Sequence, residues 1–219
     1  YTERLMNAVQ KELRLDRQPR HIECFDNSNL QGAHPVASCV VFRDGKPSRK
    51  EYRHFNIKTV TGADDYASMR EVVFRRYTRL MAEGAEMPDL IIADGGKGQM
   101  GVIHEVLERL GLDIPIAGLA KDDRHRTAEL LCGFPPVLVG IRPTSPLFHF
   151  LAHIQEEVHR FAVSFHRQKR SKAFIHSELE QIEGVGDKTV QTLLRHFRTV
   201  EKVRAANIEE LSALVGAAK

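Results

Sequence analysis

Apolar residues recur at helical spacing in some parts of the chain and form short runs bounded by Gly, Pro or Asp in others. Helical spacing covers residues 1–14, 66–83, 97–110 and 143–170, whereas short runs predict strands at 21–26, 36–43, 49–59, 90–93 and 114–119. Asp44-Gly45 is typical of a hairpin turn. The order predicts an α/β fold, with an antiparallel meander and then parallel crossovers in one mixed sheet with flanking helices. Residues 127–132 and 136–141 are expected to form a second hairpin or an insertion.

The pattern also predicts how the chain divides. Residues 1–20 are expected to be a linker helix, residues 21–172 the sheet domain, and residues 177–219 a small all-α domain after a linker near 172–177. In that last segment, a short helix, the turn Gly184-Val185-Gly186 and a second helix predict a helix-hairpin-helix unit. Its glycines expose backbone N–H groups at a helix N-terminus, which can bind a phosphate oxygen without reading sequence. A second copy begins at 200, and its closing helix is expected to be missing. The alternative is a pair of helical hairpins that only pack on a neighbour.

Composition narrows the class of protein. The chain has 219 residues and a formal net charge of +3, which is ordinary for a globular protein of one core and a small appendage. Its cysteines, Cys24, Cys39 and Cys132, form no CxxC pair, which argues against a disulfide framework and suits the cytoplasm. No apolar run approaches membrane-spanning length, so no membrane partner is expected. The run GGKGQ lacks the spacing of a phosphate-binding P-loop, which argues against a nucleoside triphosphatase. The chain is expected to be a fragment of a longer protein.

Two aspartates carry the candidate chemistry. Asp26 ends the first predicted strand, and Asp94 ends the fourth, just before a glycine cluster. If these strands are neighbours, their carboxylates meet at one edge of the sheet and repel unless a cation lies between them. Oxygen ligands of this kind suit Mg²⁺ or Mn²⁺, which can promote phosphodiester hydrolysis. A histidine of the long helix could be a further ligand or a general base, but spacing does not choose among His149, His153, His159 and His166.

Several separated motifs together resemble a known family. The chain resembles the C-terminal half of the UvrC nucleotide-excision-repair nucleases in a series of motifs that occur in the same order. These motifs are HIECFDNSN, VASCVVF, TGADDYASM, IIADGGKGQ, QEEVHRFAVSFHRQKR and IEGVGDKT. The resemblance implies an RNase H-like endonuclease domain followed by tandem helix-hairpin-helix motifs. It also implies incision of damaged double-stranded DNA on the 5′ side of a lesion, after loading by a UvrB-like partner.

The resemblance also implies roles for individual residues. The catalytic residues of the family fall on Asp26, Asp65, Asp94 and His159, of which Asp26, Asp94 and His159 would hold the metal. Asp65 opens a helix, so it is expected to position water or a ligand, whereas the simpler alternative for Asp64 or Asp65 is a helix cap. The expected DNA-backbone contacts are Lys97, His166, Arg167, Lys169, Arg170, Gly184, Val185, Gly186, Lys188 and Thr189.

Two other functions remain open from the sequence. A non-catalytic DNA-binding adaptor on the same scaffold would share every basic feature but need no metal. An RNA-cleaving enzyme of the same fold would differ in substrate, although helix-hairpin-helix motifs favour duplex DNA. The chain lacks the N-terminal half that carries the family's 3′ nuclease and main UvrB-binding segment, so the 3′ activity is not expected of it.

Overall fold

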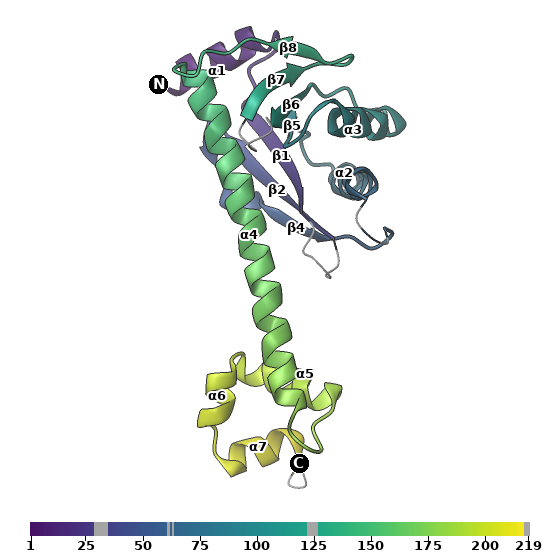
Figure 1. Ribbon diagram of the computed structural model, residues 1–219, viewed down its shortest axis with the longest axis vertical. Coiled ribbons are helices and arrows are strands. Elements are labelled where there is room, and N and C mark those ends of the chain that lie inside the picture. The colour runs from purple at the N-terminus through teal and green to yellow at the C-terminus, as the bar shows by residue number, and fades with distance from the viewer. Residues whose placement is uncertain (29–34, 61, 63, 122–126, 217–219) are drawn as a thin grey trace. The chain divides into compact units, whose positions relative to one another are not determined.

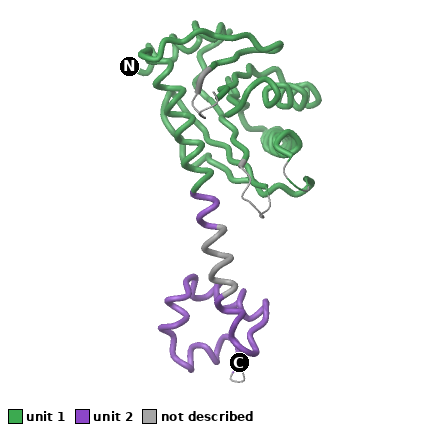
Figure 2. The backbone as a smooth tube through the Cα atoms, in the orientation of Figure 1, with its two compact units in different colours: residues 1–163 green, residues 164–219 purple. Residues whose placement is uncertain are grey.

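The computed structural model describes residues 1–28, 35–60, 62, 64–121 and 127–216, without the side chains of 28, 127, 128 and 169–177. The chain forms two compact units, residues 1–163 and residues 164–219, which Figure 2 colours green and purple. The first unit holds the sheet and the main hydrophobic core. Among the described residues, every helix is too short or too polar to cross a membrane.

One mixed sheet organises the first unit (Figure 1). The strand order is β3-β2-β1-β5-β6-β7-β8, and β4 also pairs with β2. The pairs β1–β5 and β5–β6 are parallel, and the other pairs are antiparallel, as predicted for a meander followed by crossovers. The strands are β1 (His21–Ser28), β2 (Val36–Arg43), β3 (Lys46–Pro47), β4 (Arg53–Asn56), β5 (Leu90–Ala93), β6 (Ile116–Lys121), β7 (Thr127–Cys132) and β8 (Val137–Val139).

Helices cover both faces of this sheet. α2 (Asp65–Ala82) and α3 (Lys97–Leu110) lie side by side on one face, where Tyr77 packs edge-on against Phe25 of β1. The part of α4 (Pro146–Glu180) within the first unit packs on the other face, where Phe150 meets Phe42 of β2. Successive side chains of a strand point to opposite faces, so β1 presents Glu23 and Phe25 to α2 and presents Asp26 to the face of α4.

The meander differs from the prediction in its third strand. Asp44 and Gly45 both have positive φ, 52° and 79°, as a two-residue hairpin turn with twist-matched strands requires. Pro47 has no N–H to continue the ladder, so β3 ends there after two residues. A single 3₁₀ turn, Arg49–Glu51, follows, and the chain then rejoins β2 as β4.

The first helix is not a linker. α1 (Thr2–Glu12) buries Leu5, Met6 and Val9 in the core of the first unit, so the predicted separation of residues 1–20 is corrected. Its apolar stripe is the reason, because a helix with one apolar face is stable only where that face is covered. A Cβ at Gly45 would lie 3.1 Å from Leu5, so the hairpin turn approaches α1 closely.

The second unit is helical. α4 runs without a break through the predicted linker at 172–177, and the boundary between the units falls within this helix, at 163/164. After Gly184, whose φ is +82°, come α5 (Asp187–Phe197), α6 (Val200–Ala205) and α7 (Ile208–Val215). α5 contacts both α6 and α7. The predicted truncation concerns a helix after Gly216, where residues 217–219 lie outside the described part of the chain.

Candidate active site

The two predicted aspartates are neighbours at one edge of the sheet. β1 and β5 pair in parallel up to Phe25 and Ala93, and the amide of Asp94 donates to the carbonyl of Phe25 at 3.0 Å. Asp26 and Asp94 therefore occupy equivalent positions just past the last paired residues. The carboxyl edge of parallel strands is where open α/β sheets bind their ligands.

The electrostatics of this edge reflect two close carboxylates. Burial and the charge of Asp94 raise the pKa of Asp26 to about 7, and Asp65 adds to the rise, whereas Lys121 opposes it. A rise of this size means that the folded protein holds a proton on Asp26 that water would have removed. The raised pKa shows that a second negative charge at this edge lacks sufficient positive charge nearby, and a bound cation would supply that charge.

Two residues that the sequence analysis did not single out hold Asp94. Gln155 of α4 donates from Nε2 to Oδ1 of Asp94 at 2.9 Å, and Nζ of Lys121, at the end of β6, lies 3.4 Å from Oδ2. The Asp94 side chain is only 1% exposed, so these contacts constrain both of its oxygens. Lys121 lies just past the strand predicted at 114–119, and in the structure it ends β6, the strand next to β5. Gln155 lies one helical turn before His159 and therefore on the same side of α4.

The aspartates that open α2 have separate roles. Asp64 is the N-cap, and its side chain accepts a hydrogen bond from the amide of Ala67 at 3.0 Å. Asp65 is the first helical residue and is exposed, and its backbone carbonyl accepts a hydrogen bond from Asn27 of β1 at 2.8 Å. The cap interpretation thus applies to Asp64, and Asp65 lies close enough to Asp26 to affect its pKa.

His159 is exposed on α4, one turn beyond Gln155. The other candidates differ in surroundings, because His153 packs edge-on against Phe42 at 5.4 Å between ring centroids, and His166 is buried. Within the described residues, no three carboxylate, histidine or cysteine side chains are grouped closely enough to form a complete metal cage. Asp26 and Asp94 alone still suit Mg²⁺, which commonly takes one or two carboxylates and completes its shell with water and substrate phosphate.

Some of the predicted DNA contacts need correction. His166 and Thr189 are 7% and 6% exposed, so their buried side chains do not suit contact with a phosphate backbone. The side chains of Lys169 and Arg170 lie outside the described part of the structure. The remaining predicted contacts lie at the surface or in the turn before α5: Lys97, Arg167, Gly184, Val185, Gly186 and Lys188.

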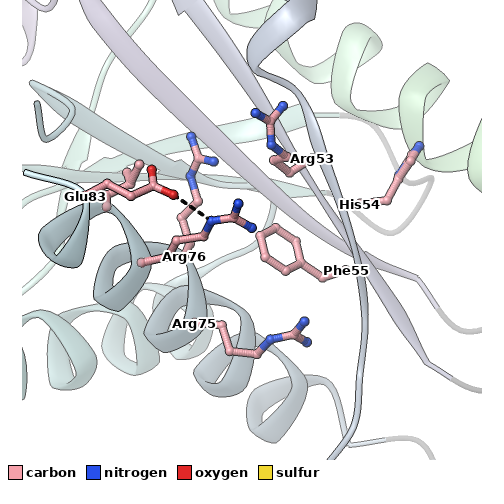
Figure 3. Close-up of a pocket in the computed structure, with 8 residues that line it drawn as sticks. Arg53, His54, Phe55, Arg75, Arg76 and Glu83 are labelled. Carbon is pink, nitrogen blue, oxygen red and sulfur yellow. Dashed lines mark hydrogen bonds and ion pairs between the residues drawn. The ribbon is translucent and has the colours of Figure 1, made fainter. Parts of the chain in front are cut away.

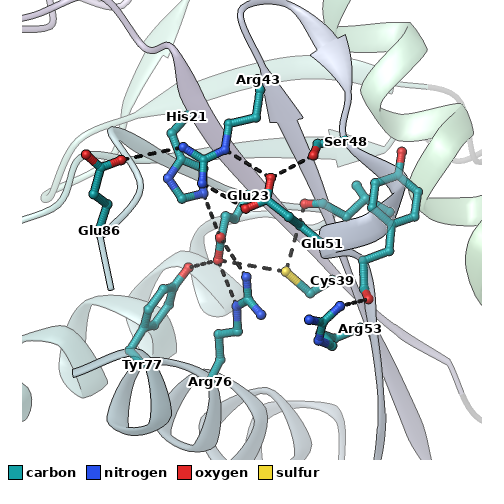
Figure 4. A network of polar contacts seen from close by, with 12 residues as sticks. His21, Glu23, Cys39, Arg43, Ser48, Glu51, Arg53, Arg76, Tyr77 and Glu86 are labelled. Atoms are coloured by element: carbon teal, nitrogen blue, oxygen red, sulfur yellow. Dashed lines mark hydrogen bonds and ion pairs between the residues drawn. The ribbon is translucent and has the colours of Figure 1, made fainter. Parts of the chain in front are cut away.

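A buried polar network lies between β1 and α2, on the face of the sheet opposite to Asp26 (Figure 4). Glu23 of β1 accepts hydrogen bonds from Nε and Nη2 of Arg76 at 3.0 and 2.8 Å and from the hydroxyl of Tyr77 at 3.0 Å. Nε2 of His21 lies 2.8 Å from the same carboxylate. Burial would raise the pKa of Glu23, but the bonds from His21 and Arg76 outweigh it and lower the pKa to about 2. The network ties α2 to β1 and stays charged at neutral pH.

A hollow of about 220 Å³ between β4 and α2 gathers four arginines (Figure 3). Most of their charge is already balanced, because Arg75, Arg76 and Arg79 pair with Glu71, Glu23 and Glu83 at 2.8–3.0 Å. Arg53 donates to the backbone carbonyls of Lys50 and Tyr52. The hollow is therefore held together by internal ion pairs and lies on the sheet face opposite to Asp26.

Comparison with known proteins bears on this site. The chain is 60% identical to the UvrABC system protein C of Bacteroides fragilis over 216 residues, 99% of this chain and 36% of that protein. It is 57% identical to the Streptococcus uberis protein of the same name, over 92% of this chain and 34% of that protein. The chain thus spans about a third of the length of these curated relatives. A solved endonuclease V of Ciona intestinalis, in complex with an inosine-containing DNA, has a TM-score of 0.37 at 15% identity, covering 56% of this chain and 61% of that one.

Family comparison covers most of the chain. Residues 177–219 match the SAM-like helix-hairpin-helix tandem family. Residues 10–163, which include the whole sheet and both aspartates of the pair, match the family described as the UvrC RNAse H endonuclease domain. The chain belongs to the UvrC RNase H endonuclease domain family, and its mixed sheet with flanking helices is the RNase H-like fold expected of a member.

Proposed function

We propose that this chain is a divalent-metal-dependent endodeoxyribonuclease that makes the 5′ incision beside a lesion in bacterial nucleotide excision repair, as the C-terminal part of a UvrC-like subunit. The observation that carries the proposal is the pairing of Asp26 and Asp94 at the carboxyl edge of β1 and β5, with the pKa of Asp26 raised to about 7. A carboxylate pair of this kind, within a family of endonucleases, is suited to phosphodiester hydrolysis.

Asp26 and Asp94 would hold Mg²⁺ or Mn²⁺, with His159 as a further ligand. When bound, such an ion lowers the pKa of a water nucleophile and offsets charge on the leaving oxygen. Gln155 holds one oxygen of Asp94, which restricts how this carboxylate can turn toward a bound ion. Lys121 supplies a positive charge where an anionic substrate must approach. Asp65, which is exposed at the start of α2, would position the attacking water.

Duplex DNA carrying damage is the proposed substrate, and a UvrB-like protein in the cytoplasm is the proposed loading partner. The turn Gly184-Val185-Gly186 before α5, together with Lys188 and Arg167, would bind phosphates without reading bases. Lys97 would add a contact beside Asp94 in the first unit. Damage-directed cutting needs binding of this kind, because the position of a lesion does not depend on sequence.

Mn²⁺ binding measured by calorimetry tests the proposal most directly. Wild type should bind the ion saturably, and Asp26→Ala should lose that binding. Asp113→Ala, which removes an exposed carboxylate outside the site, is the matched control and should bind as wild type does. A folded wild-type chain that binds no Mn²⁺, with or without DNA, would contradict the proposal and favour the non-catalytic adaptor. A nicking assay of DNA against RNA strands then separates the proposed substrate from RNA.

A further inference from the structure

A groove of about 720 Å³ opens between the first turns of α2 and α3. Asp65 lies on one wall and Lys97 on the other. The groove adjoins the carboxylate pair, because Lys97 follows closely after Asp94 in the chain and Asn27, the neighbour of Asp26, donates to the backbone carbonyl of Asp65 at 2.8 Å. Its volume is ample for one nucleotide beside the bond to be cut.

One residue that lines this groove, Tyr66, has an aromatic side chain that is not buried in the core. Tyr66, the second residue of α2, is 53% exposed, whereas Tyr77 of the same helix is fully buried. Half-exposed aromatic rings beside a nucleic-acid site can stack on bases, since every base offers a π face.

The ring of Tyr66 rests against a residue with no side chain. A Cβ built at Gly98 would lie 2.2 Å from Oη of Tyr66 and within 2.8 Å of two of its ring carbons, a distance that real atoms do not reach. Any larger residue at 98 would displace the ring. The absence of a side chain at Gly98 therefore allows Tyr66 to pack against the first turn of α3.

The opposite wall supplies positive charge. Lys97 is exposed and is the first residue of α3, a helix of 14 residues whose positive end faces the groove. A lysine and an aromatic ring that line the same groove match the two chemical parts of a nucleotide, which are its phosphate and its base.

We propose that this groove binds one unstacked nucleotide of the DNA strand to be cut, with its base on Tyr66 and its phosphate beside Lys97. The inference rests on the proposed nuclease function and adds to it a subsite that prefers a locally unpaired strand. Fully stacked duplex cannot offer a base to Tyr66, so the subsite favours DNA that is already distorted at the cut.

Photo-crosslinking of the full chain tests the subsite. A short single-stranded oligodeoxynucleotide carrying 5-iododeoxyuridine is bound in EDTA, which prevents cutting, then irradiated, and the crosslinked peptide is identified by mass spectrometry. The crosslink should map to Tyr66, persist in Tyr66→Phe and vanish in Tyr66→Ala, whose affinity should fall about tenfold. Gly98→Ala should lower the yield although Tyr66 is still present. Phe74→Ala, which removes a 39% exposed ring of the same helix, is the matched control and should change nothing.

The subsite is overturned if the crosslink maps elsewhere, or if Tyr66→Ala binds the oligonucleotide and crosslinks as wild type does. If Gly98→Ala proves unfolded by circular dichroism, the comparison of Tyr66→Ala with Tyr66→Phe decides alone. Asp26→Asn keeps the two proposals apart, because it should abolish cutting but leave the crosslink to Tyr66 intact. Cutting that survives Asp26→Asn would contradict the nuclease mechanism, whatever the crosslink shows.

Discussion

Glu23 of β1 and Arg76 of α2 form a buried ion pair with two hydrogen bonds, in which the Glu23 side chain has no exposed surface and the Arg76 side chain is 10% exposed. The same strand carries Asp26 and the same helix carries Asp65. The Glu23–Arg76 pair thus holds α2, which carries Asp65, against β1, which carries Asp26. The pair lies on the face of the sheet opposite to Asp26.

Removing one partner of this pair should be costly. Arg76→Met leaves Glu23 charged and buried with fewer donors, and we expect a loss of about 3 kcal/mol in the free energy of unfolding, measured by urea denaturation. Arg79→Met, one turn further along α2, breaks the exposed pair with Glu83 and should cost less than about 0.5 kcal/mol. Equal losses in the two variants would show that the buried pair does not anchor α2.

The raised pKa of Asp26 predicts a pH dependence of stability. Between the unfolded value of 3.8 and the folded value of about 7, the folded protein holds a proton that the unfolded chain has released. Raising the pH through this range in metal-free buffer therefore lowers the free energy of unfolding, by at most about 1.4 kcal/mol per pH unit. Thermal melts across the range should show this decline in wild type and a weaker one in Asp26→Asn. Parallel curves would mean that Asp26 titrates normally.

The two contacts of Asp94 should affect metal affinity in opposite directions. Gln155→Ala frees the carboxylate to rotate, so Mn²⁺ should bind about tenfold more weakly. Lys121→Met removes a positive charge that opposes a cation at Oδ2, so Mn²⁺ should bind more tightly while DNA binds less well. Lys46→Met, an exposed lysine on β3, controls for the change in net charge. Unchanged affinity in both site variants would mean that neither residue acts on the metal position.

The basic run that contains Lys169 and Arg170, within α4, should contribute to DNA binding through charge alone. Replacing Lys169 and Arg170 with Ala should weaken binding equally across DNA sequences and reduce the salt dependence by roughly one unit per lost phosphate contact. Lys11→Ala with Lys46→Ala removes the same charge from exposed positions of the first unit and should leave the slope unchanged. A wild-type slope in the Lys169 and Arg170 variant would exclude this run from the DNA surface.

The element order and the Asp26–Asp94 pair were predictable because they depend on local spacing and on a general property of parallel strands. A buried strand that ends in Asp, followed by glycines, places its carboxylate at the ligand-binding edge wherever the strand lies in the sheet. The break after β3 also had a visible signal in Pro47.

Other features of the fold and the site depend on which distant segments pack together. The spacing of residues along the chain does not determine this packing. The apolar spacing of α1 was visible in the sequence, but the segments that bury this face were not. Gln155 is one polar residue among many on α4, and only the fold brings it to Asp94. His166 lies off the apolar stripe and is nevertheless buried, because its surroundings are set by tertiary packing.

The division of the carboxylate pair between β1 and β5 has a consequence for the life of the protein in the cell. Asp26 and Asp94 are far apart in the chain, with α2 between them, and they come together only through the parallel pairing of β1 with β5. A nascent or partly unfolded chain therefore carries neither half of a working centre in the right place. Integrity of the proposed site in the cell thus depends on the pairing of β1 with β5, and any unfolding that separates these strands also separates the two carboxylates.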